Sequence, residues 1–377
     1  MAGTVLCLLL VFSSTVAATG GARPPAIFVF GDSTLDVGNN NYLPGSGVPR
    51  ANMRHYGIDF PGSVATGRFS NGYNIADFLA KNMGFSASPP AYLSLVPSNG
   101  RLVQAAVAGG VSYASGGAGI LDSTNAGNNI PLSKQLQYFR STRSQMVTKL
   151  GSRATSLLLA KSVFLFSVGS NDMFVFAVAE AKQNNKSTSD QQRDVATLYA
   201  NLLSGYSAAI NELHALGARK LAIINVGLLG CVPSARLRHA AGACSGELNQ
   251  LASGFDGALA STLAGLASTL RSPASGGGFA YSLADYYAFS AATFDDPAAS
   301  GYTDVEDACC GGGRLGAEVG CGTANATVCG DRDRHAFWDA VHPSQRSAML
   351  TAQNFYDSRP GRYTAPINFK ELAQTGL

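Results

Sequence analysis

The chain has 377 residues, of which 46% are hydrophobic and 14% are charged. A chain this long and this apolar can bury a large core, so its composition excludes intrinsic disorder. The formal net charge is +3 and no polybasic run occurs, so nothing indicates a nucleic-acid partner or an anionic membrane surface.

The N-terminal segment contains an apolar run over residues 5–12, followed by small residues over 13–18. This arrangement is typical of a secretory signal peptide, and the run is too short to span a membrane. We expect residues 1–20 to be a signal peptide, cleaved within a few residues of that boundary. No later stretch has eighteen uninterrupted apolar residues, so we expect a secreted chain without a transmembrane segment.

Strand and helix patterns alternate along the chain. Apolar runs predict buried strands over residues 26–30, 163–168, 221–226 and 279–283. Apolar side chains spaced by three and four predict helices over residues 75–83, 132–150 and 248–270. This order predicts an α/β fold with a parallel sheet covered on both faces. No repeat or linker divides it, so we expect one domain over residues 24–377.

Ser33 directly follows the first predicted strand, in the sequence Gly31-Asp32-Ser33. Ligands of α/β sheets bind at the carboxyl ends of the strands, which makes Ser33 a candidate nucleophile. Gly31 permits a tight turn there, and Asp32 is expected to accept hydrogen bonds from turn amides. The alternative interpretation is that Ser33 caps a helix starting just beyond it.

Two further motifs could donate hydrogen bonds to an oxyanion. A glycine-rich stretch over residues 110–119 can bring backbone N–H groups close to a ligand, and it lacks the lysine of a phosphate-binding loop. Asn171 follows the strand over 163–168, where a side-chain amide can stabilise developing negative charge. The alternative is that both motifs are only turns.

The C-terminal motif is Asp339-Ala340-Val341-His342-Pro343. Pro343 can open a helix and so place His342 on the loop before it. A tight turn then brings the Asp339 carboxylate to the imidazole Nδ1 and leaves Nε2 free as a base. A surface hydrogen bond is the alternative for this pair alone. The remaining histidines have no matching pattern and are expected at the surface or at helix ends: His55, His214, His239 and His335.

Six cysteines follow the predicted signal peptide, and an even number in a secreted chain predicts disulfides. Cys231 and Cys244 enclose a short loop and are expected to pair. The sequence leaves open how the other four pair: Cys309, Cys310, Cys321 and Cys329. Zinc is the rival interpretation, but no C-x-x-C pair occurs. Sequons at Asn185 and Asn325 are potential N-glycosylation sites.

Taken together, these residues supply the parts of an acyl-transfer site. Ser33 is the nucleophile, His342 the base and Asp339 its orienter, while Gly116 and Asn171 are oxyanion donors. Such a site requires no cofactor and no metal.

The sequences FGDSTLDVGNN, GVSYASGGAGI, GSND and DAVHPS, in this order, resemble the four blocks of the GDSL esterase/lipases of the SGNH hydrolase superfamily. The similarity covers residues 26–357, and the CCG segment resembles the plant-type secreted branch. The resemblance implies a flavodoxin-like three-layer α/β/α sandwich with a mainly parallel five-stranded sheet. It also implies a triad of Ser33, Asp339 and His342. The Ser33 N–H, Gly116 and Asn171 would form the oxyanion hole, with Gly117 as the alternative if the alignment shifts by one.

The implied function is a secreted serine esterase or lipase, extracellular or in the cell wall, acting through an acyl-enzyme. Its partner would be an ester substrate: a lipid, an acetylated polysaccharide, or a cutin-type or phenolic ester. We expect a monomer. Two alternatives stay open, namely an acyltransferase with the same acyl-enzyme and a silent binding protein on the same fold.

Overall fold

The computed structural model describes residues 23–376, except 97, 99, 184–185 and 273–277. The predicted signal peptide and the sequon at Asn185 lie outside the described residues. The other sequon residue, Asn325, is exposed in a loop. Within the described ranges, no helix is both long enough and apolar enough to cross a membrane.

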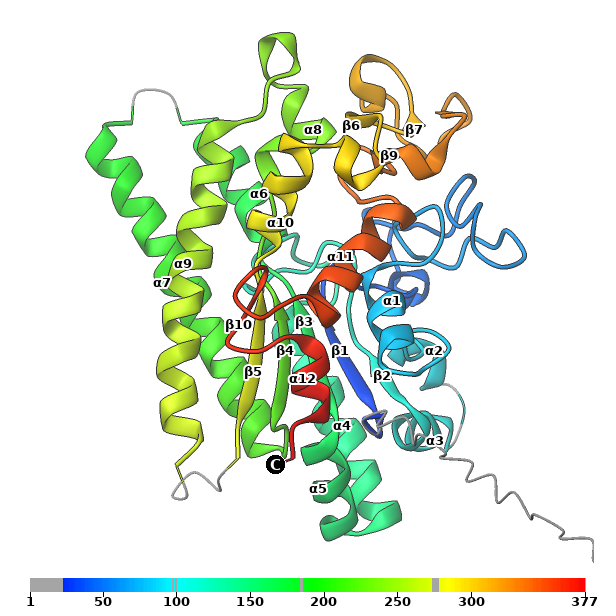
Figure 1. Ribbon diagram of the computed structural model, residues 1–377, viewed down its shortest axis with the longest axis vertical. Coiled ribbons are helices and arrows are strands. Elements are labelled where there is room, and N and C mark those ends of the chain that lie inside the picture. The colour runs from blue at the N-terminus through cyan, green and yellow to red at the C-terminus, as the bar shows by residue number, and fades with distance from the viewer. Residues whose placement is uncertain (1–22, 97, 99, 184–185, 273–277, 377) are drawn as a thin grey trace, which may run out of the picture.

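The centre of the fold is a six-stranded sheet with the strand order β10-β5-β4-β3-β1-β2 (Figure 1). Its strands are β1 (Ile27–Gly31), β2 (Gly110–Ser112), β3 (Val163–Ser167), β4 (Lys220–Ile224), β5 (Ala280–Ala284) and β10 (Thr364–Ala365). Strands β1 to β5 are parallel, and β10 pairs antiparallel with β5. The predicted mainly parallel sheet is confirmed, with β10 as a short sixth strand at its edge.

The strands are mostly apolar because helices cover both faces of the sheet. Side chains alternate along β1, so Phe28 and Phe30 face one layer while Ile27 and Val29 face the other. The first layer contains α4 (Leu132–Leu150), α7 (Thr188–Ala215) and α9 (Gly246–Leu270). The second contains α1 (Ile75–Asn82), α11 (Gln345–Asp357) and α12 (Phe369–Gln374). The three-layer α/β/α arrangement is therefore as predicted (Figure 1).

The predicted helices over 75–83, 132–150 and 248–270 correspond to α1, α4 and α9. The other helices are α2 (Tyr92–Leu95), α3 (Arg101–Ala108), α5 (Ser152–Lys161), α6 (Ser170–Glu180), α8 (Pro233–Arg236) and α10 (Tyr286–Asp295). Helix α4 ends where Gly151 adopts a φ of 85°, a conformation that costs glycine little.

A smaller region, here called the disulfide segment (residues 304–338), lies at one end of the sheet (Figure 1). It contains β6 (Asp304–Ala308) paired with β9 (His335–Phe337), and β7 (Cys310–Gly311) paired with β8 (Thr327–Val328). Two disulfides cross it, Cys309–Cys329 and Cys310–Cys321. The expected pair Cys231–Cys244 is also bonded, so all six cysteines of the described chain form disulfides and zinc thiolates are excluded.

Candidate active site

Ser33 lies in a turn at the carboxyl end of β1, with its neighbour Asp32 bonded through the backbone N–H to the Ser167 carbonyl of β3 at 3.0 Å. The turn requires glycine at position 31. Gly31 has a φ of 154°, and a Cβ there would lie 2.3 Å from the Ser167 oxygen. No helix begins at this turn; the next helical element is a short 3-10 helix at Asn39–Tyr42. The interpretation of Ser33 as a helix cap is therefore wrong.

The structure brings Ser33 and His342 together across 309 positions of sequence, with Ser33 Oγ 2.8 Å from His342 Nε2. On the other side of the imidazole, Nδ1 lies 2.8 Å from each carboxylate oxygen of Asp339. A serine, a histidine and an aspartate thus form one continuous hydrogen-bonded relay. This is the arrangement in which a histidine can act as a general base.

The Asp339 carboxylate stabilises the turn of the loop that carries both Asp339 and His342. Asp339 Oδ1 accepts hydrogen bonds from the N–H groups of Val341 at 2.9 Å and His342 at 2.8 Å. The following helix, α11, starts at Gln345 and is capped by Ser344, whose side chain accepts from Ser347 N–H. The expectation that Pro343 opens this helix is wrong by two residues, because Ser344 is the N-cap and Pro343 lies before it, outside the helix.

The charges of this pair favour the ionised forms. Burial disfavours a charged imidazole, but the negative charge of Asp339 and its hydrogen bond outweigh burial and raise the pKa of His342 above its ordinary value. Burial also opposes the Asp339 carboxylate, yet the charge of His342 and the donated hydrogen bonds keep its pKa below the usual range. Asp339 is thus a carboxylate that holds the imidazole in place.

The glycine-rich stretch starts as strand β2 and continues as a loop held by buried carboxylates. Gly116 N–H donates to Asp36 Oδ2 at 3.0 Å, and Asp36 Oδ1 accepts from Gly38 and Asn39 N–H. A Cβ at Gly116 would lie 2.5 Å from the Phe69 ring. The Gly116 N–H, predicted as an oxyanion donor, is therefore already engaged, whereas Gly117 N–H has no partner among the described residues.

Asn171 is the second residue of α6, which starts at Ser170, shortly after the end of β3, with Gly169 as its N-cap. Its Nδ2 donates to the Ala118 carbonyl at 3.0 Å, which leaves the second amide hydrogen available. The next residue, Asp172, accepts from Ile120 N–H at 2.9 Å and Leu121 N–H at 3.1 Å. The side chains of Asn171 and Asp172, which are neighbours on α6, thus hold the glycine-rich loop against this helix.

Asp32 behaves as expected for a turn aspartate, because its Oδ1 accepts from both Thr34 N–H at 3.0 Å and Thr34 Oγ1 at 2.8 Å. Thr34 stands where the resembled family has leucine. Its hydroxyl gives Asp32 a hydrogen-bond donor that a leucine side chain would lack. Burial raises the pKa of Asp32 to about 6, and its charge interacts with His342. A second carboxylate therefore acts on His342 from the turn that carries Ser33.

The other histidines do not join this relay. His335 lies 3.4 Å from Cys329 Sγ and 3.6 Å from Asp304 Oδ2. Cys309, Cys329 and His335 are close enough together to suggest a metal site, but the two sulfurs are bonded to each other and cannot act as thiolate ligands. His214 is buried in α7, away from a carboxylate partner.

A cavity of about 630 Å³ lies beside α1 and α11. Tyr73, Phe78 and Lys81 line one side, and Arg346 and Met349 line another. None of the predicted site residues borders it. The candidate active site is therefore defined by the Ser33 relay and not by this cavity.

Two aromatic residues at the site were not predicted from the sequence. The Phe69 ring lies 4.8 Å from the His342 ring, and the Tyr56 hydroxyl donates to Asp339 Oδ2 at 2.8 Å. Both belong to the loops between η1 (Asn39–Tyr42) and α1. Their contacts span more than 270 positions of sequence, so no local pattern could have marked them.

Comparisons with known proteins show the family to which the chain belongs. The family model described as GDSL-like Lipase/Acylhydrolase matches residues 27–355. A GDSL esterase/lipase of Arabidopsis thaliana is 37% identical over 372 residues, covering 97% of this chain and 94% of the relative. A second one from the same plant is 35% identical over 379 residues, covering 98% and 96%. The chain therefore belongs to the GDSL esterase/lipase family and is a hydrolase of the GDSL type.

Proposed function

We propose that the protein is a carboxylic-ester hydrolase that forms an acyl-enzyme on Ser33. The observation that supports this best is the relay from Ser33 Oγ through His342 to Asp339, with 2.8 Å on each side of the imidazole. As Oγ attacks the ester carbonyl carbon, His342 Nε2 takes the hydroxyl proton and then gives it to the departing alcohol. Water, deprotonated by His342, then attacks the acyl carbon, and His342 gives that proton to Ser33 Oγ as the acid leaves.

We propose that three donors hold the oxyanion: Ser33 N–H, the Asn171 amide and Gly117 N–H. The Ser33 and Gly117 N–H groups have no partner among the described residues, so they can turn to a substrate oxygen without losing a bond. Gly116 N–H would first have to leave the buried Asp36 carboxylate, which costs free energy. Gly116 then serves mainly to let Phe69 approach the loop.

The location we propose is extracellular. Three disulfides are characteristic of an oxidising compartment, and the exposed sequon at Asn325 suits the same route. The names of the relatives point to ester bonds, so we propose a lipid, glycan, cutin-type or phenolic ester as the substrate class. One domain and a monomeric state remain our predictions.

A fluorophosphonate probe tests the nucleophile directly. We expect one label per chain on the peptide containing Ser33, with loss of p-nitrophenyl acetate hydrolysis in proportion to labelling. Ser33→Ala should take no label, whereas Ser133→Ala, which removes a half-buried serine on α4, should label normally. Labelling at another residue, or full activity after complete labelling, would refute the proposal. Transfer to an added alcohol in preference to water would identify an acyltransferase instead.

A crystal structure of the same adduct shows whether Gly116 or Gly117 donates to the oxyanion. The phosphoryl oxygen takes the place of the oxyanion, so its distance to each backbone nitrogen is the measurement. We expect about 3 Å to Gly117 N, with Gly116 N still on Asp36. The reverse pattern would restore Gly116 as the donor.

A further inference from the structure

The Asp339 carboxylate receives a hydrogen bond from a distant part of the chain. The Tyr56 hydroxyl donates to its Oδ2 at 2.8 Å, across 283 positions of sequence. Both carboxylate oxygens lie 2.8 Å from His342 Nδ1, but only Oδ1 also accepts from N–H groups of its own loop. The two oxygens are thus fixed from different directions.

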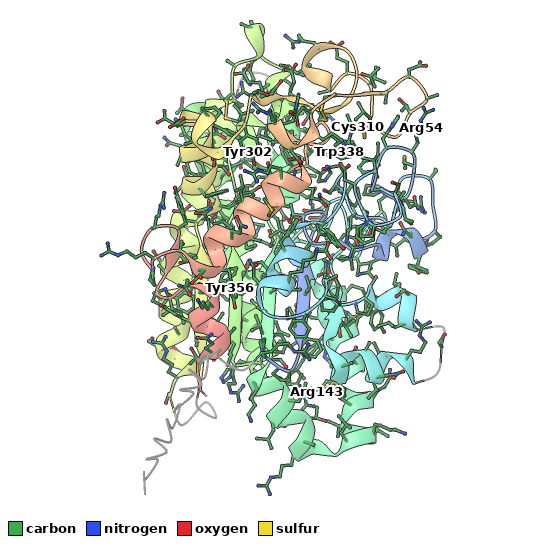
Figure 2. The ribbon with its side chains drawn as sticks, turned by 45° about the vertical axis from the view of Figure 1, so that its right-hand side comes forward. Arg54, Arg143, Tyr302, Cys310, Trp338 and Tyr356 are labelled. Atoms are coloured by element: carbon green, nitrogen blue, oxygen red, sulfur yellow. A yellow bond between two sulfur atoms is a disulfide. The ribbon has the colours of Figure 1, made fainter. Side chains whose placement is uncertain are left out.

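The Tyr56 ring is itself held in place by packing. It contacts a buried cluster formed by Trp338 and the disulfide cysteines Cys309, Cys310 and Cys321. Figure 2 shows Cys310 and Trp338 close together at one end of the molecule, with Arg54, two residues before Tyr56, on the same side. The ring also packs edge-on against Phe69, at 6.4 Å and 77°, and Phe69 contacts the His342 ring.

Backbone hydrogen bonds join this packing wall to the catalytic loop. Cys309 N–H donates to the Phe337 carbonyl at 3.1 Å, and Cys310 N–H donates to the Trp338 carbonyl at 2.6 Å. Trp338 N–H in turn donates to the His342 carbonyl at 2.8 Å. The support of the Tyr56 ring and the loop that carries Asp339 are therefore parts of one connected unit.

From this geometry we propose that Tyr56 is a positioning residue of the triad, which fixes the Asp339 carboxylate and moderates its pull on the His342 proton. This inference rests on the proposed function. A donor on Oδ2 draws charge away from one of the two oxygens that face Nδ1, so the imidazolium is held less tightly than it would be without this donor. Burial raises the pKa of the Tyr56 hydroxyl, so the group stays a donor at any pH at which the enzyme works.

The test is Tyr56→Phe, which keeps the ring and removes the hydroxyl. We expect kcat to fall about tenfold, as for one lost hydrogen bond to a charged group, with KM nearly unchanged. The acidic limb of the kcat/KM profile should move to higher pH, because the unshared carboxylate raises the pKa of His342. Asp32 is the other charged group acting on His342, and it is unaltered in the variant.

Tyr199→Phe is the matched control, since it also removes a tyrosine hydroxyl, one that donates to the Leu251 carbonyl at 2.7 Å between α7 and α9. Its kcat and its pH profile should equal those of the wild type. Wild-type kcat and an unmoved acidic limb in Tyr56→Phe would overturn the inference. So would a lower kcat with an unmoved limb and a lower unfolding temperature, which would mean that the hydroxyl only stabilises the fold.

Ser33→Ala in the same assay keeps the two proposals apart. If Ser33→Ala is inactive while Tyr56→Phe behaves as wild type, only the role of Tyr56 fails. If Ser33→Ala keeps its activity, the proposed function itself fails.

Discussion

The proposed nucleophile, Ser33, and its proposed base, His342, are held in place by two different kinds of structure. Ser33 follows β1, which lies between β2 and β3 in the sheet and is fixed by apolar layers on both faces. Asp339 and His342 follow the disulfide segment, which has only two-stranded pairings. Val305, Ala336 and Phe337 of this segment join the main core, and Trp338 forms a separate small cluster with the disulfide cysteines. A small segment cannot bury enough apolar surface to hold a precise geometry by itself. The comparison teaches that disulfides add to core packing in holding the proposed base, whereas packing alone holds the proposed nucleophile.

The largest effect is expected on the nucleophile side. Ser33→Ala should lower kcat by about a million-fold, because the atom that forms the acyl bond is gone. Its unfolding temperature should stay near that of the wild type, since the half-buried hydroxyl adds nothing to the core. Steady-state hydrolysis measures kcat, and circular-dichroism melting measures the unfolding temperature. Substantial remaining turnover would mean that another group attacks the ester.

The link between the sheet and the glycine-rich loop is tested by Asn171→Ala. Loss of one oxyanion donor should lower kcat by about a hundred- to a thousandfold, with KM little changed. The change also removes the bond to the Ala118 carbonyl, so a control for loop anchoring is needed. Asn129→Ala removes bonds to the Thr124 and Asn125 carbonyls of the same loop and should keep kcat within a few-fold. An effect of Asn171→Ala on KM alone would contradict the oxyanion role.

The contrast between support by the core and support by disulfides is tested by removing one disulfide. In the double variant Cys310→Ser with Cys321→Ser, the segment should lose about 2–4 kcal/mol of stability. We expect activity to be lost on heating well before the helices and the sheet melt, because only the base is displaced. Activity and far-ultraviolet circular dichroism are followed on one temperature ramp. If both signals fall together and at the wild-type temperature, the segment does not depend on this bond.

The smallest effect is a shift of the pH profile. His342 must be neutral to take the Ser33 proton and its pKa is raised, so kcat/KM of the wild type should rise with pH through a value above the ordinary ~6.5 of histidine. Asp32→Asn removes a negative charge but keeps an acceptor for Thr34. The imidazolium is then less favoured, and the acidic limb should move to lower pH by up to about one unit. A limb that stays in place or moves upward would show that Asp32 does not act on His342.

Much of the nucleophile side could be predicted from the sequence, because its determinants are local. Continuous apolar runs marked β1, β3, β4 and β5, and the turn after β1 carries its own glycine and aspartate. The edge strands β2 and β10 were missed, since they have three and two residues and too few side chains to show a period.

The base side was less predictable. The Asp339–His342 pair is a local motif, but its support is not. Adjacent cysteines at 309 and 310 allow several pairings that only the folded segment resolves. Tyr56 and Phe69 meet the relay through contacts between distant loops, and Asp36 engages Gly116 across 80 positions. Such contacts leave no periodic trace in the sequence.

The central claim is that an acyl group passes through Ser33, and trapping that intermediate tests it most directly. The enzyme is mixed with excess p-nitrophenyl acetate, quenched in acid within the first turnovers, digested and analysed by mass spectrometry. We predict an added acetyl mass on the peptide that contains Ser33, decaying when substrate is exhausted, and none in Ser33→Ala. An acetyl group found on another residue during turnover would contradict the account. So would the absence of any acetylated peptide at every quench time, with deacylation made slow by low pH.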